Sequence, residues 1–177
     1  MQCIKASSMR LTSLTGQTRS KYEDGTLVVV DMQRFFVKGC LNPRLVANVV
    51  REVLMARRKG WAIVLLECEP ERNGDTITPV ARLLSGSGGY ARTRRKSKDA
   101  EDGSEQVIEV CRENGYSLTN FRVVGVWSDC CVEQTAVSLV EKLEDAFVRV
   151  VKRACSTNFE EKTGWEVFRK RARLKVA

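Results

Sequence analysis

Two adjacent cysteines, Cys130 and Cys131, are the residues of this sequence best placed for nucleophilic chemistry. They follow the turn-forming pair Ser128 and Asp129 and precede apolar residues that recur at helical spacing. A thiol in the first turn of a helix lies near unpaired N–H groups and the positive end of the helix dipole, which stabilise the nucleophilic thiolate. Two buried structural cysteines at a strand–helix junction would give the same local pattern, because cysteine is often buried.

Histidine is absent from the 177 residues. Its absence excludes a Cys–His dyad, a Ser–His–Asp triad and any His-ligated metal within this chain. Proton transfer near neutral pH must therefore use a carboxylate, a lysine or a cysteine. Asp31 is one candidate, because it ends an apolar run at the edge where open α/β sheets place their chemistry. An aspartate that only caps a nearby turn would look the same in the sequence.

The chain carries a formal charge of +8, and its basic residues are concentrated in two segments, Arg92–Lys98 and Phe168–Lys175. Such segments can bind nucleic acid, an acidic protein or an anionic substrate. A solvated basic surface is the simpler interpretation, because no aromatic side chains are interleaved as a stacking platform would need.

The candidate residues lie among segments whose patterns alternate between strand and helix. Apolar, β-branched runs predict buried strands at Thr26–Asp31, Trp61–Leu66, Val123–Trp127 and Phe147–Val151. Helical spacing and capping residues predict helices from Asn42 to Gly60, over Ser104–Asn114, from the Cys130–Cys131 pair onward, and over Gly164–Leu174. This alternation predicts a three-layer α/β domain, Rossmann-like, with a mainly parallel sheet.

Composition suits a single domain over residues 25–177, preceded by a polar leader, 1–24, that we expect to be flexible. No apolar run is long enough to span a bilayer, and the N-terminus lacks the apolar region of a signal peptide. We therefore expect a cytoplasmic protein whose seven cysteines are thiols rather than a disulfide framework.

The pattern is loosest between Pro70 and Asp102. We expect a mobile loop at Ser85–Gly89, with the basic cluster Arg92–Lys98 on the loop that follows. A phosphate-binding loop is not favoured for these glycines, because they lack the GxxxxGK[ST] order and do not lie between a predicted strand and a predicted helix.

Two segments, VVVDMQ and GVWSDCCVEQTA, together resemble the isochorismatase-like cysteine hydrolases, which include nicotinamidases and N-carbamoylsarcosine amidases. The first family motif ends a strand in Asp-x-Gln, which Asp31 and Gln33 match. The second is G-x-x-[ST]-x-x-C-V-x-x-[ST]-A, and it is matched by Gly125, Ser128, Cys131, Val132, Thr135 and Ala136. The resemblance covers about Leu27 to Thr157.

By this register the resemblance implies that Cys131 is the nucleophile, that Cys130 takes a variable position and that Asp31 is the base. The family also uses a lysine, and counting back from Gly115 places it at Lys96, with Lys98 as the competing candidate. We expect this lysine and its basic neighbours to give the pocket a positive rim.

The resemblance further implies a cis peptide bond at Val126–Trp127 and an oxyanion hole made by the backbone N–H groups of Trp127 and Cys131. Substrate contacts are expected from Gln33 and Phe36.

The implied activity is hydrolysis of a C–N bond in a small amide or carbamoyl compound, anionic compounds included, through a thioester, in a homo-oligomer. No cofactor or metal is expected, because Glu67–Pro70 lacks the histidine of the nicotinamidase metal cluster. Bulky Trp127 and basic Arg153 depart from the usual family residues. They leave an alternative open: a noncatalytic binding or inhibitory protein on the same fold, which engages nucleic acid or an acidic partner.

Overall fold

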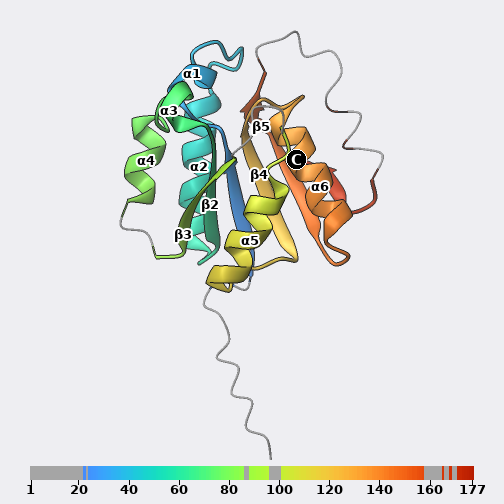
Figure 1. Ribbon diagram of the computed structural model, residues 1–177. Coiled ribbons are helices and arrows are strands. Elements are labelled where there is room, and N and C mark those ends of the chain that lie inside the picture. Colours follow the sequence, from blue (N-terminus) through green and yellow to red (C-terminus); the bar gives the residue numbers. More distant parts are fainter. Residues whose placement is uncertain are drawn as a thin grey trace, which may run out of the picture.

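The protein, described here from a computed structural model, has a six-stranded sheet in the order β3-β2-β1-β4-β5-β6 (Figure 1). The structure describes residues 22, 24–85, 88–95, 101–157, 165, 168 and 171–177. The strands are β1 Thr26–Val30, β2 Ala62–Cys68, β3 Tyr90–Arg95, β4 Asn120–Val126, β5 Phe147–Ser156 and β6 Leu174–Val176. All neighbouring strands pair in parallel, so their carboxyl ends meet at one edge of the sheet.

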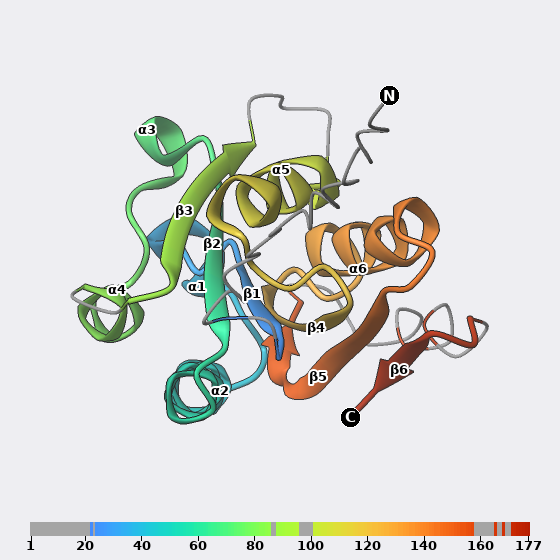
Figure 2. The same ribbon diagram turned by 90° about the horizontal axis from the view of Figure 1, so that it is seen from below.

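Helices cover both faces of this sheet (Figure 2). One face carries α5 (Ser104–Asn114) and α6 (Cys131–Lys142), and the other carries α2 (Leu45–Arg58) and α4 (Thr78–Leu84). Alternate residues of β1 enter the two cores: Val28 and Val30 pack with the α5–α6 side, Leu27 and Val29 with the α2–α4 side. The predicted three-layer α/β architecture with a parallel sheet is confirmed.

Two short helices, α1 (Arg34–Val37) and α3 (Pro70–Asn73), lie at the carboxyl edge of the sheet, at the upper side of Figure 1. They follow β1 and β2 directly in the chain. Each has only four residues, too few for a helical period to be recognised in the sequence.

The helix predicted from Asn42 begins instead at Leu45. Asn42 still organises the turn before it, since its Oδ1 accepts the Arg44 N–H at 3.0 Å and its Nδ2 donates to the Arg153 and Cys155 carbonyls. The asparagine therefore ties the entrance of α2 to β5. By contrast, α5 has the predicted bounds and ends at Gly115, whose φ of +64° suits glycine.

The basic segment Arg92–Arg95 forms most of β3, where a loop was predicted. A strand at the edge of a sheet tolerates alternating charged side chains, so it lacks the apolar run that identifies a central strand. Leu174 was also predicted wrongly: it begins β6 rather than ending a helix. Most of the predicted helix over Gly164–Leu174 lies outside the described residues, as do residues 86–87 of the predicted loop.

Strand β5 continues to Ser156, beyond the predicted end at Val151. A register shift opposite Val123–Gly125 allows it to follow β4 to the end, with Val126 opposite Ser156. Of the predicted leader, only residues 22 and 24 are described, and Tyr22 packs edge-on against Tyr116 at 5.6 Å between ring centroids. In the described part of the chain, no helix is both long and apolar enough to traverse a membrane.

A buried carboxylate joins α2 to the sheet. Glu52, 2% exposed, accepts hydrogen bonds from Arg122 Nε on β4 at 2.9 Å and from Arg153 Nη2 on β5 at 2.9 Å. Arg153, which departs from the usual family residue, thus has a structural partner, since a buried carboxylate needs a compensating charge.

Candidate active site

The pairing of β1 with β4 brings the candidate base and the candidate nucleophile to the same edge of the sheet. Val30 lies opposite Gly125, so Asp31 and the turn from Trp127 to Cys131 leave the same edge of the sheet. Asp31 is 1% exposed and Cys131 is 7% exposed. Since the chain runs to β2 on one side of β1 and to β4 on the other, this is the switch point at which open α/β sheets bind ligands.

The close approach of β4 to β1 requires a glycine at position 125 of the motif. Its φ is +125°, and a Cβ at this position would lie 2.0 Å from the Val30 carbonyl oxygen. No side chain fits that space, and L-residues rarely adopt that backbone conformation. Glycine therefore allows β4 to pass close to β1 just before the turn that carries the cysteines.

The turn before α6 is fixed by its own backbone and by β5. The Val126–Trp127 peptide bond is cis, as the motif predicted. The N–H groups of Cys130 and Val132 donate to the Trp127 carbonyl at 3.1 and 3.0 Å, and the Ser128 N–H donates to the Ser156 carbonyl at 3.0 Å. These bonds hold Cys131 as the first residue of α6.

A cavity of about 470 Å³ lies against this turn. Its walls come from α1, from the end of β2 through α3, from the segment before α5 and from the turn that leads into α6. They comprise Phe35, Phe36, Cys68, Glu69, Arg72, Asn73, Glu101, Trp127, Cys130 and Cys131. Its size is that of a small-molecule site, and the candidate nucleophile is part of its wall.

Aromatic side chains form one wall of the cavity. The rings of Phe36 and Trp127 meet edge to face, with 5.1 Å between centroids. Phe35 stacks edge-on against Phe36 at 5.4 Å and is 63% exposed at the mouth. Phe36, predicted as a substrate contact, thus lies where it can touch a bound molecule, and Trp127 narrows the same space.

Gln33 lies elsewhere. Its side chain is fully buried and is not among the residues that line the cavity. Its Oε1 accepts the Cys68 N–H at 2.8 Å, and its Nε2 donates to the carbonyls of Cys68 and Gly74 at 3.1 and 2.8 Å. Gln33 therefore connects the chain after β1 to the segment after β2, which carries cavity residues.

Asp31 has an unusual backbone. Its φ is +47°, a left-handed conformation that is uncommon outside glycine. The Asp31 N–H donates to the Leu66 carbonyl at 2.9 Å, and its own carbonyl accepts the Gln33 N–H at 2.7 Å. Backbone strain of this kind costs about 1–3 kcal/mol and is concentrated at functional sites.

Glu67, the penultimate residue of β2, is a fully buried carboxylate that the sequence analysis did not assign to the site. Its Oε1 accepts the Thr76 hydroxyl at 2.6 Å and the Thr76 N–H at 3.3 Å. Its Oε2 lies 3.3 Å from Arg92 Nε. Burial opposes the charge of the Arg92 guanidinium, but a hydrogen bond with Tyr90 and the charge of Glu67 raise its pKa overall.

The adjacent thiols differ in character. The Sγ atoms of Cys130 and Cys131 lie 3.9 Å apart, and both residues line the cavity. The pKa of the Cys130 thiol is raised far above its usual range by the hydrogen bond with Cys131, by burial and by Glu101. These surroundings favour the protonated form of Cys130.

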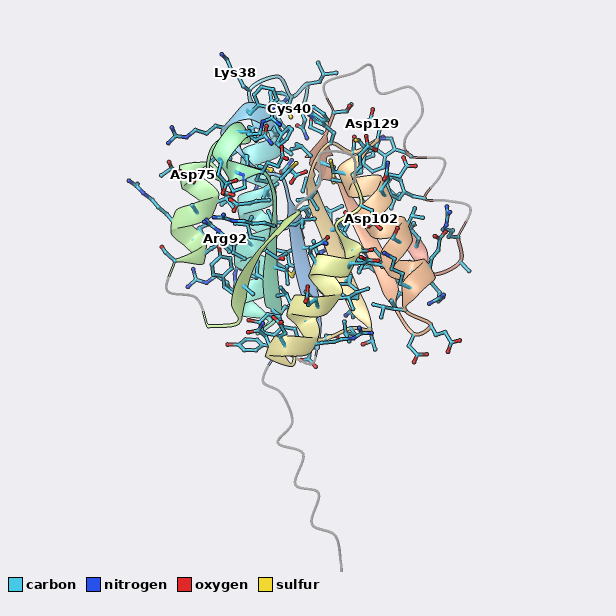
Figure 3. The ribbon with its side chains drawn as sticks, in the orientation of Figure 1. Lys38, Cys40, Asp75, Arg92, Asp102 and Asp129 are labelled. Atoms are coloured by element: carbon cyan, nitrogen blue, oxygen red, sulfur yellow. The ribbon has the colours of Figure 1, made fainter. Side chains whose placement is uncertain are left out.

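The segment that carries Glu101 is anchored to α6. Asp102 lies between α5 and α6 in Figure 3, and its Oδ2 accepts a hydrogen bond from Lys142 Nζ at 3.2 Å. The Gly103 N–H donates to the Thr135 hydroxyl at 3.1 Å, which gives this motif residue a structural task. Glu101 itself accepts a hydrogen bond from Gln134.

The predicted catalytic lysine, Lys96, and its competitor Lys98 lie outside the described residues. Arg95, which precedes Lys96, pairs with the cavity residue Cys68 at the end of β3. Arg92 lies well apart from Asp129 and the cysteine turn in Figure 3, and neither Arg92 nor Arg94 lines the cavity.

The charged residues in the described walls are Glu69, Arg72 and Glu101, so these walls do not make the predicted positive rim. Over the described residues, no group of three cysteine or carboxylate side chains could hold a metal ion.

Comparison with known proteins agrees with this geometry. The model of the isochorismatase domain matches residues 26–174. No curated protein matches the sequence. Among solved structures, MAR1 ribonuclease from Caenorhabditis elegans is similar at 20% identity and a TM-score of 0.69, over 85% of this chain and 73% of that one.

Two further structures share the fold. YcaC from Escherichia coli, described as an octameric hydrolase of unknown specificity, has 18% identity and a TM-score of 0.72, over 89% of this chain and 76% of its own. N-carbamoylsarcosine amidase from Thermoplasma acidophilum has 19% identity and a TM-score of 0.65, over 86% and 94%. At these identities the likeness concerns the fold.

Proposed function

Because this chain belongs to the isochorismatase family, we propose that it is a hydrolase that cleaves a C–N bond in a small amide or carbamoyl compound with Cys131 as nucleophile. The observation that carries the proposal is the pairing of Val30 with Gly125, from which Asp31 and the Cys131 turn leave one edge of the sheet. Cys131 lines a cavity of small-molecule size and begins a helix, where the dipole favours a thiolate.

In this mechanism Asp31 accepts the Cys131 thiol proton, and the thiolate attacks the carbonyl carbon of the substrate. The backbone N–H groups of Trp127 and Cys131 donate to the oxyanion. The C–N bond breaks as the amine leaves with the proton returned by Asp31, and a thioester remains on Cys131. Asp31 then takes a proton from water, whose oxygen attacks the thioester and releases the acid and the thiol.

Burial of Asp31 is consistent with its proposed task, because loss of solvent favours the protonated form of a carboxyl group. A base whose proton affinity approaches that of a thiol can exchange a proton with it in both directions. We propose Lys96 as the cation that stabilises the ionised forms of both groups, with Lys98 as the alternative; Lys96 directly follows β3 in the chain.

The cavity favours a compact substrate with a flat or apolar part against Phe36 and Trp127. The described walls carry two acidic side chains, Glu69 and Glu101, and one basic side chain, Arg72, so they have no positive net charge. Recognition of an anionic substrate would therefore depend on Lys96. We assign Gln33 a positioning role in place of substrate contact, because its amide oxygen and nitrogen both bind the backbone of the β2–α3 region.

Activity is tested by screening wild-type protein against a panel of small primary amides and carbamoyl compounds, with ammonia release as the readout. Cys131→Ala is the matched control, because it removes the thiol and leaves the helix intact. We expect release from at least one compound class by the wild type and none above background by Cys131→Ala. Equal release by both proteins would overturn the proposal.

We also propose a homo-oligomer that works in the cytoplasm without a metal or cofactor. The octameric state described for E. coli YcaC supports the assembly, and the chain has no histidine to ligate a metal. Analytical ultracentrifugation tests the assembly, and turnover in the presence of a chelator tests the metal. For the alternative of nucleic-acid binding, Arg92 and Arg94 are weak support, because they pair with Glu67 and Glu71.

A further inference from the structure

Cys130 has no part in the proposed hydrolysis, yet it adjoins the nucleophile in space as well as in sequence. Its Sγ lies 3.9 Å from Cys131 Sγ, and both thiols face the same cavity. The described residues include six cysteines, all of them thiols, and among these Cys130 and Cys131 line the same cavity with their sulfurs in contact. A small molecule that reaches Cys131 therefore meets two sulfurs.

The two sulfurs have complementary chemistry. Cys131 begins α6, where the helix dipole favours its thiolate. The hydrogen bond with Cys131, burial and Glu101 raise the pKa of Cys130, which favours its thiol form. A thiolate is the form that peroxides oxidise to a sulfenic acid, and a sulfenic acid condenses with a thiol within reach.

We propose that Cys130 is a resolving thiol, so that the pair is a modification site at which a small hydroperoxide reversibly switches off the enzyme. The inference rests on the proposed function in one respect: it takes Cys131 as the reactive thiolate. The described cavity gives a small oxidant the same access as a substrate.

Oxidation of the pair takes two steps. The Cys131 thiolate attacks the distal peroxide oxygen, the O–O bond breaks, and the hydroperoxide leaves as an alcohol, or as water from hydrogen peroxide, after taking one proton. Cys131 is now a sulfenic acid. The Cys130 sulfur displaces its hydroxyl group, which leaves as water with the Cys130 proton, and an S–S bond forms. Two thiols are oxidised by two electrons, and the peroxide is reduced by two.

The geometry makes this disulfide easy to reverse. The sulfurs must approach from 3.9 Å to about 2.0 Å, a movement that side-chain rotation and a small adjustment of the turn can supply. Adjacent Cα atoms are about 3.8 Å apart, closer than the roughly 4.4–6.8 Å of ordinary disulfides. The eight-membered ring is therefore strained, and strained disulfides are the more readily reduced.

The biological consequence is protection. A sulfenic acid without a resolving thiol is oxidised further to a sulfinic acid, which thiols do not restore. Formation of the Cys130–Cys131 disulfide prevents this further oxidation. A dithiol reductant can then convert Cys131 back to the active thiol.

The test is intact-mass spectrometry of the full-length protein after limited hydrogen peroxide, before and after dithiothreitol. For wild type we expect a loss of about 2 Da (two hydrogens), mapped by non-reducing peptide analysis to the peptide with both Cys130 and Cys131, and reversed by dithiothreitol. For Cys130→Ser we expect a gain of about 32 Da (two oxygens) on Cys131 that dithiothreitol does not reverse.

Matched variants identify the resolving residue. Cys68→Ser removes the third thiol of the cavity and should leave the reversible mass loss intact, as should Cys40→Ser, which removes a half-buried thiol that does not line the cavity. Cys131→Ser should abolish both products. If Cys130→Ser destabilises the protein, Cys130→Ala provides the same reading with an apolar side chain.

A disulfide that pairs Cys131 with Cys68, or a reversible mass loss that persists in the Cys130 variants, would overturn the inference. Different results would refute this inference and the proposed function. Ring closure without turnover of any amide in the panel would refute the hydrolase and keep the switch. Turnover that Cys131→Ala abolishes, without ring closure in the wild type, would do the reverse.

Discussion

Asp31 follows β1, and Glu67 is the penultimate residue of the neighbouring strand β2; solvent hardly reaches either residue, at 1% and 0% exposure. Glu67 has an extended place in a strand and binds Thr76 and Arg92. Asp31 has a left-handed backbone and lies next to the turn that carries the cysteines. The two residues share burial and sheet position, so neither property by itself identifies a functional carboxylate.

What separates them is their surroundings. Each Glu67 carboxylate oxygen has a partner, Thr76 for Oε1 and Arg92 for Oε2, and these contacts join β2 to its neighbours. Such contacts suit a structural anchor. The strained backbone and the thiol-bearing turn beside Asp31 are features that folding alone does not require. This comparison assigns chemistry to Asp31 and stability to Glu67, and mutations can test both assignments.

The largest effect is expected for Asp31→Asn. Asparagine keeps the shape, tolerates a positive φ and cannot accept the thiol proton. Single-turnover rates on an amide identified in the panel should fall by about 10²–10⁴-fold, the usual contribution of a general base, with an unchanged circular dichroism spectrum. Near-normal turnover would refute the assignment of Asp31 as the base.

The same assay tests whether Lys96 acts with Asp31. Lys96→Ala should slow the single-turnover rate, and the double variant should lose less than the sum of the two losses, because both residues act on one thiol. Lys98→Ala is the control for the competing position. Additive losses would show that the two residues act independently.

Gln33→Ala should give the largest loss of stability among these variants. It leaves backbone groups of Cys68 and Gly74 without their side-chain partner in a buried region. Unfolding by urea should show a decrease of about 2–4 kcal/mol in the free energy of unfolding. If KM rose strongly while stability did not change, Gln33 would be a substrate contact after all.

Glu67→Gln should cost less stability, because glutamine keeps the size and can still accept a hydrogen bond from Thr76. We expect a loss of about 1–3 kcal/mol in the free energy of unfolding, with single-turnover rates close to wild type in the folded protein. A rate loss as large as that of Asp31→Asn would abolish the distinction between the two carboxylates.

The smallest effect is expected for Arg94→Ala. Arg94 pairs with Glu71 at 2.9 Å, but the two side chains are 51% and 70% exposed. Solvent and salt screen such a pair, so the free energy of unfolding should change by less than about 1 kcal/mol. Electrophoretic shift of single-stranded RNA by wild type and variant provides a second readout. If RNA binding is sensitive to salt and Arg94→Ala weakens it, the basic surface has a binding function.

Several parts of this protein follow from local sequence. Each central strand is a short apolar run, and α5 is bounded by helical spacing and Gly115, so these elements were predicted correctly. The strand–turn–helix segment that ends at Cys131 was recognised for the same reason. Its glycine, turn residues and helix start are consecutive, and local steric rules fix their conformation.

Edge elements were less predictable. Strand β3 alternates arginine with smaller residues, and the short helices α1 and α3 have too few residues for a period. Their conformation depends on neighbours that are distant in the chain, because an edge strand is stabilised by pairing with β2 rather than by an apolar core on both faces.

The amino-acid sequence by itself determined the nucleophile candidate, its turn and the strand that ends in Asp31, since each depends on residues close together in the chain. Only the tertiary structure decided that Gln33 binds the backbone 35 and 41 residues away and that Glu52 lies between arginines 70 and 101 residues away. Such partners are chosen by the stacking of strands and helices, because a buried polar group must find a partner wherever packing places it.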